Sequence, residues 1–594
     1  MMRNGPDSDL LESEFDVIIV GSGAGGMLAA IRAQDLGLKA AVLEKSDRYG
    51  GTSAVSGGAI WIPNNRALQG KDSSEKAMEY LLACTEEKVP RTKLARYIET
   101  APKLVDYLAS LGVEYYVHPT LTYPDYYPWL TGSLTGGRTM FVRPLEDGGV
   151  LGEEFFRLRE SYPEFKLLEK ISLDMEEGSA LLYRKPGWIK ALISVLARYW
   201  TDWGWRRRTH RDRRLTIGNA LIGGLRKAMM ERGIPLLLNT RMTGLVVENG
   251  RVTGVKIERE GQPAQLSAGR GVVLASGGFE RSQALRERHL DHLTREDWSG
   301  TPRDNNVGDA LVAAQSIGAE TEFLSEAWWV PTIRLPSRQA PNTNRHQALF
   351  FELGLPHSLC VNRNGVRFTN EINSYHHFGQ EMMRDQVNTG ANLPCWFVFD
   401  AEYRRKYPLG SLLPGRVVDD SKLPPDSFDN LLYKADTFEQ LAGKINVPPK
   451  ALEETVARYN GFASTGDDVD FGRGGNVYNL YFGDPSQKPN RTLGPLLKAP
   501  FYAVRIDLGD LGTKGGPKTD EFARVMDTQG EPIIGLYAIG NAAGSVMGSA
   551  YPGAGATLGS AMTFGLVAAE HLADTDFSND VQPALSAYPE TRLA

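Results

Sequence analysis

A short apolar strand that runs into a glycine-rich turn constrains this chain more than any other feature. Residues 15–30 read FDVIIVGSGAGGMLAA. Residues 17–20 form a β-branched run of the kind found in buried parallel strands. Gly21, Gly23 and Gly26 follow in G-x-G-x-x-G spacing, which lets backbone N–H groups and the positive end of the next helix approach a pyrophosphate. The stretch therefore predicts a dinucleotide-binding βαβ unit.

A second strand with an acid at its end strengthens this prediction. Residues 40–43 are apolar and are followed by Glu44, 18 residues after Gly26. An acidic residue at this distance suits a hydrogen bond to a ribose hydroxyl of the dinucleotide. A lone glycine motif would be weak evidence, because loops often contain glycine. The ordered series of strand, glycines, helix, strand and acid argues against a purely structural turn.

Length and composition limit which classes of protein this chain can belong to. At 594 residues the chain exceeds one ordinary core, so two or more domains are expected. The net charge of −6 gives no argument for a nucleic-acid partner. The N-terminus is polar and acidic without an apolar signal segment, which predicts a cytoplasmic protein. Cys84, Cys360 and Cys395 are far apart, so we expect neither a disulfide framework nor a metal centre held by cysteine.

Further segments rich in small residues also indicate a nucleotide site. Residues 49–63, YGGTSAVSGGAIWIP, follow the acid, and residues 271–280, GVVLASGGFE, end another apolar strand. Residues 535–543 form a strand entering a small-residue turn, and residues 551–565 open a long apolar helix. A helix start built of glycines can receive the electron-rich edge of a flavin. The sequence contains no second glycine-rich dinucleotide motif, which favours FAD over an exchangeable NAD.

These segments lie at both ends of the chain, whereas the middle differs in pattern. We therefore expect an α/β fold with a Rossmann-like FAD-binding domain built from residues 1–295 and 496–594. Residues 296–495 would form an inserted α+β catalytic domain. Within the first part, residues 74–112 have helical spacing. Residues 123–129 form an aromatic, proline-rich loop that either packs in the core or walls an apolar cavity.

Residues 186–215 are the most unusual segment. One side of a predicted helix carries aliphatic and aromatic residues: Ile189, Leu192, Leu196, Tyr199, Trp200 and Trp203. Lys190, Ser194 and Arg198 lie opposite, and six arginines follow. The charges and limited length argue against a membrane span, whereas the pattern suits a helix lying in a membrane interface beside anionic head groups. A helix docked on its own core and a contact between copies of the chain are the alternatives, and all three remain open.

With these residues in place, the chain resembles the 3-ketosteroid Δ1-dehydrogenases, FAD enzymes of the fumarate reductase and ketosteroid dehydrogenase superfamily. The matching motifs cover most of the chain: Glu44-Lys45 with Gly50-Gly51-Thr52, Gly277-Gly278-Phe279-Glu280, Ala327-Trp328-Trp329, Arg367-Phe-Thr-Asn-Glu371, Asp510-Leu-Gly-Thr-Lys-Gly-Gly516 and Tyr551-Pro-Gly-Ala-Gly555. The glycine elements are common to many flavoproteins, whereas the Ala-Trp-Trp, Asp510 and Tyr551 motifs are more discriminating. Residues 186–215 depart from compact members. They resemble the extra segment of larger, membrane-associated members that act on sterones such as cholest-4-en-3-one.

The resemblance implies 1,2-dehydrogenation of a 3-ketosteroid, in which the C2 proton goes to a tyrosine base and the C1 hydride to flavin N5. Hydrogen bonds to the C3 carbonyl would acidify C2 by stabilising enolate charge in an apolar pocket. By motif position, the donors are the Tyr551 hydroxyl and the Gly555 backbone N–H. Tyr375 is the base, and Tyr126 is a second tyrosine that bonds the base and relays its proton. Such a base would need a hydroxyl or a positive field that lowers its pKa from about 10.

The same resemblance implies the contacts to FAD. Gly21, Gly23 and Gly26 would meet the pyrophosphate, Glu44 the adenosine ribose, and the Met242 backbone the adenine. Further positions expected in the cofactor site are Lys45, Gly50, Gly51, Thr52, Ser53, Gly57, Gly58, Ala275, Gly277, Gly540, Asn541, Thr557 and Leu558. Nothing resembles the histidine attachment that makes FAD covalent, so we expect a noncovalent cofactor.

Other activities remain as alternatives. A fumarate reductase-like enzyme needs several arginine and histidine donors for a dicarboxylate, whereas the candidate cavity segments are aromatic and aliphatic. A 3-ketosteroid Δ4-(5α)-dehydrogenase uses the same enolisation on neighbouring carbons, and the Gly555 spacing and Tyr126 favour Δ1. A noncatalytic flavin-binding or membrane-anchoring protein fits poorly with three tyrosines at chemically coherent positions. A quinone is a plausible electron acceptor, because no NAD site is seen.

Overall fold

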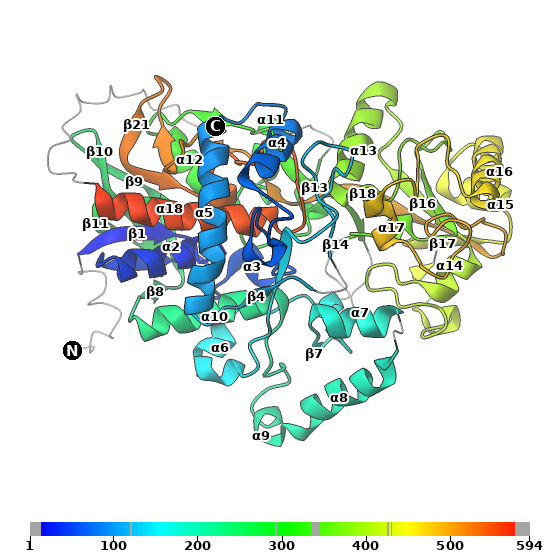
Figure 1. Cartoon of the computed structure of the whole chain (residues 1–594), viewed down its shortest axis with the longest axis horizontal. Coiled ribbons are helices and arrows are strands. Elements are labelled where there is room, and N and C mark those ends of the chain that lie inside the picture. Colours follow the sequence, from blue (N-terminus) through cyan, green and yellow to red (C-terminus); the bar gives the residue numbers. More distant parts are fainter. Residues whose placement is uncertain are drawn as a thin grey trace.

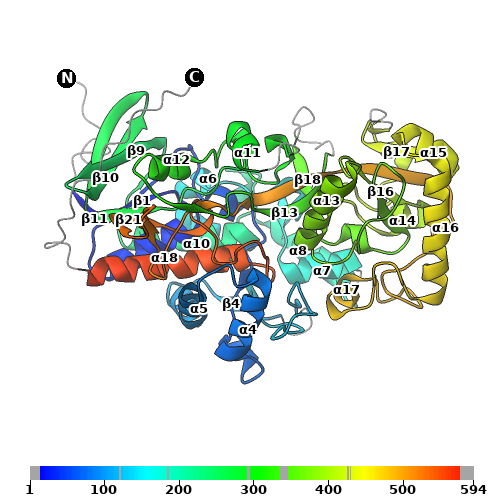
Figure 2. The ribbon, with the colours of Figure 1, turned by 90° about the horizontal axis from the view of Figure 1, so that it is seen from above.

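The computed structural model describes residues 14–118, 122–183, 186–290, 294–334, 345–424, 427–428 and 430–575. Figure 1 shows an elongated molecule in which elements from both ends of the chain, drawn blue and red, lie together at one side. The yellow elements of the middle lie at the other side. The view in Figure 2 keeps the same separation. Two different sheets underlie these two halves.

The first sheet has the predicted dinucleotide-binding strand at its centre. β1 (Phe15–Val20) pairs in parallel with β2 (Ala40–Leu43) and with β11 (Gln262–Leu274). β8 (Leu236–Leu237) pairs in parallel with β2, and β21 (Pro532–Ala538) with β11. The apolar residues of β1 are at most 5% exposed, as expected for a strand covered on both faces. Strands from both ends of the chain therefore share one sheet.

An antiparallel hairpin extends β11 beyond the parallel part. β9 (Thr240–Glu248) and β10 (Arg251–Arg259) pair with each other, and β10 pairs with β11. Asn249 and Gly250 at the turn have φ values of +51° and +78°, a combination that favours these two residue types. The hairpin brings Met242, near the start of β9, to the cavity described below.

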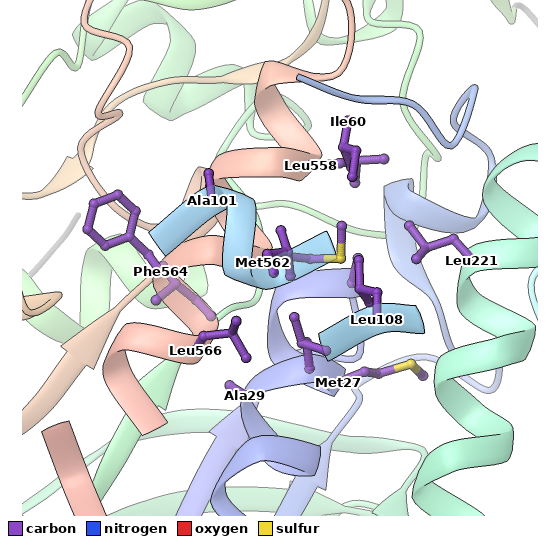
Figure 3. Close-up of a cluster of buried hydrophobic side chains, with 14 of the residues drawn as sticks. Met27, Ala29, Ile60, Ala101, Leu108, Leu221, Leu558, Met562, Phe564 and Leu566 are labelled. Atoms are coloured by element: carbon purple, nitrogen blue, oxygen red, sulfur yellow. The ribbon is translucent and has the colours of Figure 1, made fainter. Parts of the chain in front are cut away.

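Four helices pack together beside the first sheet and form the largest core. They are α2 (Ala24–Asp35), α5 (Arg91–Ser110), α10 (Ile217–Glu231) and α18 (Ala556–Asp574). Figure 3 shows Met27 of α2, Leu108 of α5, Leu221 of α10 and Met562 of α18 in one cluster. The helical prediction for 74–112 is confirmed, with a break between α4 (Ser74–Thr85) and α5.

Glycines let α2 and α18 approach backbone to backbone. A Cβ atom at Gly25 would lie 2.8 Å from the carbonyl oxygen of Ala561. A Cβ atom at Gly565 would lie 2.8 Å from the carbonyl oxygen of Gly25. Backbone atoms cannot swing aside as a flexible side chain can, so larger residues at either position would force the helices apart. This contact joins the N-terminal dinucleotide unit to the C-terminal helix.

The second sheet is antiparallel and lies at the other side of the molecule. Its strand order is β14 (His346–Ala348), β13 (Ala327–Arg334), β18 (Phe501–Thr513), β16 (Cys395–Phe399) and β15 (Ser358–Val361), with β17 (Leu432–Ala435) also paired to β18. Helix α13 (Tyr375–Thr389) packs on β13. β18 belongs to this sheet although it lies beyond residue 495. The predicted division into domains stays a prediction.

The segment at 186–215 forms α8 (Trp188–Thr201) and α9 (Trp203–Arg206), which project from the body near α7 (Met175–Tyr183) (Figure 1). The predicted apolar face is wrong in part, because Tyr199 turns inward with Val195 and packs on Ile171. Large apolar side chains remain outside: Ile189, Ile193, Trp200 and Trp203 are 56%, 61%, 61% and 71% exposed. In the part of the chain that the structure describes, no helix has the length and apolar character needed to cross a membrane.

Most of the arginines that follow α8 are held within the chain. Arg214 pairs with Asp174 and Glu177, each at 2.8 Å. Arg213 pairs with Asp147 at 3.2 Å. The guanidinium of Arg211 is stacked 4.6 Å from the ring centroid of Phe155 and lies 3.8 Å from the Glu160 carboxylate. The basic run is therefore largely engaged in contacts within the chain, which leaves fewer arginines for anionic head groups than the sequence pattern indicates.

Gly565→Ala should lower the free energy of unfolding by about 1–3 kcal/mol, because the added methyl group meets the Gly25 backbone. Thermal unfolding and FAD retention measure the effect. Gly461→Ala in α16 (Pro449–Thr465) is the matched control, since a Cβ atom there meets nothing within 4 Å. Helix propensity predicts a gain of up to about 1 kcal/mol for this control. Equal midpoints for the two variants would contradict the close helix contact.

Candidate active site

A cavity of about 2220 Å³ is lined by both ends of the chain and by its middle. Pockets for one small ligand are typically about 300–1,000 Å³, so this one has room for a dinucleotide and a second large molecule. All of the predicted cofactor-site and catalytic residues except Gly50 line it. The structure thus brings together residues that are up to several hundred positions apart in the sequence, although their individual roles remain predictions.

The glycine turn after β1 is tightly fitted against the end of β11. Gly21 has a φ of +115°, and a Cβ atom there would lie 2.4 Å from the carbonyl oxygen of Ala275. A Cβ atom at Gly26 would lie 2.2 Å from the carbonyl oxygen of Gly21. Gly23 is the N-cap of α2, so the start of this helix opens onto the cavity. A compact turn at a helix start is the arrangement that accommodates a pyrophosphate.

Glu44 lies at the end of β2, beside the same turn. Its carboxylate accepts hydrogen bonds from the Ser22 hydroxyl at 2.5 Å and from the Ser46 backbone N–H at 3.0 Å. Gly50 lies behind this site, where its N–H donates to the Ser22 hydroxyl at 2.9 Å. Lys45 is held by an ion pair with Asp309 at 2.8 Å. The acid is therefore fixed in orientation at the cavity wall.

The shape of the wall fits a bound FAD. Cβ atoms at Gly51 and Gly57, which line the cavity, would meet no protein atom within 4 Å. The missing side chains leave open space beside a wall of backbone, as a flat cofactor requires. The hydroxyls of Thr52 and Ser53 face the same region, and Ser53 accepts a hydrogen bond from the Ala24 N–H at 3.1 Å. The residues present are therefore compatible with a flavin dinucleotide.

Three predicted catalytic tyrosines meet in the cavity. The Tyr126 hydroxyl donates to the Tyr375 hydroxyl at 3.0 Å. The ring of Tyr551 lies 5.1 Å from that of Tyr126 and 5.7 Å from that of Tyr375, between centroids. Tyr375 begins α13, whereas Tyr126 and Tyr551 lie on loops far apart in the sequence. Three hydroxyl-bearing side chains from separate elements therefore share one wall.

The neighbouring tyrosines have different partners. Tyr127 accepts a hydrogen bond from the Tyr551 backbone N–H at 3.1 Å. Tyr123 packs against Phe141 and Tyr481, with centroid distances of 5.3 Å and 5.0 Å. Of these three closely spaced tyrosines, only Tyr126 hydrogen-bonds Tyr375 within the described residues.

Burial raises the pKa of Tyr375 well above its usual value of 10, and neighbouring Tyr551 adds to this effect. The hydrogen bond from Tyr126 acts in the opposite direction. Burial likewise raises the pKa of Tyr126. The donor hydroxyl that such a base needs is present in Tyr126, but the loss of hydration outweighs its effect on the pKa of Tyr375.

The loop that carries Tyr126 rests on a buried ion network. Arg138 is fully buried and pairs with Asp72 at 2.6 Å and Asp125 at 2.8 Å. Burial raises the pKa of Asp125 to about 6, while Arg138 opposes the shift. Asp125 also accepts from the Trp61 indole N–H at 2.8 Å. These contacts fix the residue immediately before Tyr126.

One further tyrosine was not identified from the sequence. Tyr478 is 2% exposed, lines the cavity, and its ring lies 5.3 Å from that of Tyr126. Its hydroxyl has no hydrogen-bond partner among the described residues. The aromatic composition of residues 477–482 was the only signal, and it does not distinguish packing from substrate contact.

Comparisons with known proteins agree with this geometry. The FAD binding domain family model matches residues 16–558. The 3-oxosteroid 1-dehydrogenase of Comamonas testosteroni is 38% identical over 93% of this chain and 96% of its own. A 4-oxocyclohexanecarboxylate 2-dehydrogenase of Sinomonas cyclohexanicum is 34% identical over 98% of this chain and 97% of its own.

A solved structure also matches nearly the whole chain. It is the 3-ketosteroid Δ1-dehydrogenase from Sterolibacterium denitrificans in complex with 1,4-androstadiene-3,17-dione. The TM-score is 0.90 at 46% identity, and the match covers 94% of this chain and 99% of that one. The matching family model shows that FAD is the cofactor. The chain therefore belongs to the FAD-dependent 3-ketosteroid Δ1-dehydrogenase family.

Proposed function

We propose that this protein introduces the 1,2 double bond into a 3-ketosteroid. The observation that carries the proposal is the group of three tyrosines on one wall of a cavity that also receives the glycine turn of the FAD site. Bound FAD supplies the acceptor for the hydride that leaves C1. The protein's own residues then have two tasks, which are to acidify C2 and to take up its proton.

Tyr551 and the backbone N–H of Gly555 perform the first task by donating to the C3 carbonyl. Gly555 is the N-cap of α18 and has a φ of +93°. A Cβ atom there would lie 2.5 Å from the backbone of Ala59, so the position favours glycine. Donors fixed in a dry cavity stabilise developing enolate charge far better than water does. This stabilisation makes the C2 proton removable.

Tyr375 performs the second task, with Tyr126 as its partner. The Tyr126 hydroxyl points its hydrogen at the Tyr375 oxygen, which favours negative charge on Tyr375. Because the pKa of Tyr375 is raised, its phenolate form, which can accept the C2 proton, is scarce at neutral pH. A proton that arrives on Tyr375 therefore has to leave again before the next turnover, and Tyr126 is placed to relay it.

The walls near the tyrosines favour a large apolar substrate. Tyr123, Phe141, Phe350, Phe351 and Phe482 line the cavity there. A dicarboxylate would instead require several convergent cationic donors. Farther out, apolar residues of α7 and α8 line the same cavity, which supports a substrate that retains an apolar side chain, such as cholest-4-en-3-one.

We infer that residues 1–295 and 496–594 act as one Rossmann-like FAD-binding domain, and residues 296–495 as an inserted α+β catalytic domain into whose sheet β18 of the second part extends. The pairing of β21 with β11 and the packing of α18 on α2 support the joining of the two terminal parts. FAD is expected to be held noncovalently. A quinone is the expected electron acceptor.

Contact with a membrane surface is a second candidate property, favoured by the exposed side chains of α8 and α9. The exposed Trp and Ile side chains project from a protein surface that carries charges of both signs. Such side chains suit insertion at the boundary between lipid head groups and acyl chains. Trp188 and Leu192 of α8 line the cavity, so a sterone could pass from lipid into the cavity along this helix. Since most of the nearby arginines are already paired, apolar contact rather than charge would supply most of the binding.

Tyr375→Phe should slow flavin reduction by about 10²–10⁴-fold, the usual contribution of a positioned base. Tyr126→Phe should have a smaller effect, because it removes a partner of the base. Anaerobic stopped-flow bleaching of the flavin by androstenedione measures both rates. Tyr123→Phe is the control, since Tyr123 acts through its ring contacts. Wild-type rates in Tyr375→Phe would remove this residue as the base.

Flavin reduction should accelerate as the pH rises above neutrality. The base works in its unprotonated form, and the raised pKa of Tyr375 keeps it mostly protonated throughout the accessible range. Below that pKa the phenolate fraction grows about tenfold per pH unit. Single-turnover reduction between about pH 7 and pH 9 tests this against Tyr375→Phe, which should give a flat profile. A wild-type rate that is level over this range contradicts the assignment.

Replacing Ile189, Ile193, Trp200 and Trp203 by serine should abolish sedimentation with phosphatidylglycerol and phosphatidylcholine vesicles, while soluble steroids still reduce the flavin. A control with the similarly exposed Val387, Val469 and Leu497 replaced by serine should sediment like the wild type. If both variants still sediment, α8 and α9 do not mediate membrane contact. Loss of a dimer without any change in vesicle binding would assign the surface to a second copy of the chain.

A further inference from the structure

Buried side chains hold the three consecutive carbonyl groups that precede Tyr551. Lys514 Nζ donates to the carbonyl oxygens of Gly548, at 3.0 Å, and of Ala550. His376 Nε2 lies 2.9 Å from the carbonyl oxygen of Ser549. Lys514 and His376 are both fully buried. The backbone leading into Tyr551 is therefore fixed from β18 on one side and from α13 on the other.

Lys514 also contacts the ring of Trp328, which packs against Tyr551. Its Nζ atom lies 4.1 Å from the ring centroid of Trp328, over the ring face. The Trp328 ring in turn packs edge-on against Tyr551, with 4.6 Å between centroids. The indole N–H of Trp328 donates to the Asn541 side chain at 3.0 Å, which prevents the ring from rotating. One ammonium group thus holds both the backbone before Tyr551 and a ring beside it.

Burying a lysine is costly, so its presence requires an explanation. Desolvation lowers the pKa of Lys514 to about 7, while the Glu326 carboxylate opposes the shift. An apolar residue of similar volume would usually stabilise such an interior at least as well. A lysine is retained here with two carbonyl partners and a ring face, and even the neutral amine keeps two N–H donors. Its contacts therefore serve the geometry of this loop in both protonation states.

We infer that Lys514 is a positioning residue for the 1,2-dehydrogenation, holding Tyr551 so that its hydroxyl meets the C3 oxygen of the steroid. The inference rests on the proposed function of Tyr551. Lys514 does not need to touch the substrate, because it acts through the 548–550 backbone and the Trp328 ring. A displacement of about 1 Å of a catalytic group can cost about 10²-fold in rate.

A double-mutant cycle tests this role in the FAD-loaded enzyme. Lys514→Met keeps the length of the side chain and removes its donors. It should slow flavin reduction at saturating androstenedione about 10²-fold in the wild-type background. In the Tyr551→Phe background, where the positioned hydroxyl is already gone, the same change should cost less than about threefold. Lys514→Arg, which can bond both carbonyls, should recover the rate to within about tenfold of the wild type.

Lys518→Met is the matched control, because Lys518 lies four residues farther along and is paired with Glu320 at the surface. It should stay within about twofold of the wild-type rate. If Lys514→Met loses its flavin, Lys514→Gln, which retains an N–H donor pair, is carried through the same cycle. Equal costs in both backgrounds would overturn the positioning role. A wild-type rate in Tyr551→Phe alone would instead overturn the proposed role of Tyr551. Absence of flavin reduction by androstenedione in the wild type would overturn the proposed function, so the failures are distinguishable.

Discussion

The close packing of α2 against α18 is the contact on which the rest of the molecule depends. Gly25 and Gly565 allow it, because any Cβ atom at either position would meet backbone. The helix that follows the N-terminal glycine turn is thereby locked to the helix that follows the Tyr551 turn. Gly23 and Gly555, the N-caps of these two helices, both line the cavity. One helix pair thus places the glycine turn of the FAD site and the proposed donors to the substrate carbonyl.

The site then balances two opposing requirements. Enolate stabilisation needs a dry cavity, since hydrogen bonds there are not in competition with water. The same dryness raises the pKa of Tyr375, which makes the base harder to ionise. Among the described residues, the hydrogen bond that opposes this rise comes from the Tyr126 hydroxyl, so the proposed mechanism treats the two tyrosines as a pair. In the proposed mechanism, burial therefore favours activation of the C3 carbonyl and opposes ionisation of Tyr375.

Local patterns predicted the first sheet and the position of the site, but long-range packing determined the rest. The strand, the glycine turn and Glu44 lie within 30 residues, where spacing carries the information. Helix α8 packs on Ile171, and arginines that follow it are paired with acids at 146–177, so neither contact followed from helical spacing. The contacts of Lys514 and the position of Tyr478 beside Tyr126 likewise depend on residues far along the chain. The raised pKa of Tyr375 could not be predicted, because the sequence does not give burial.

The proposed base, Tyr375, and the proposed carbonyl donor, Tyr551, are connected through neighbouring residues of the protein itself. Tyr375 and His376 are consecutive residues at the start of α13, and His376 contacts the carbonyl of Ser549, two residues before Tyr551. Lys514, next to the end of β18, holds the carbonyls on both sides of Ser549. Helix α13 and the end of β18 therefore set the relative position of two groups that, in the proposed mechanism, act on adjacent carbon atoms. Side chains on rigid elements hold their positions more precisely than side chains on free loops. Tyr551 lies on a loop, but the contacts from α13 and from the residue after β18 fix the position of its proposed catalytic hydroxyl.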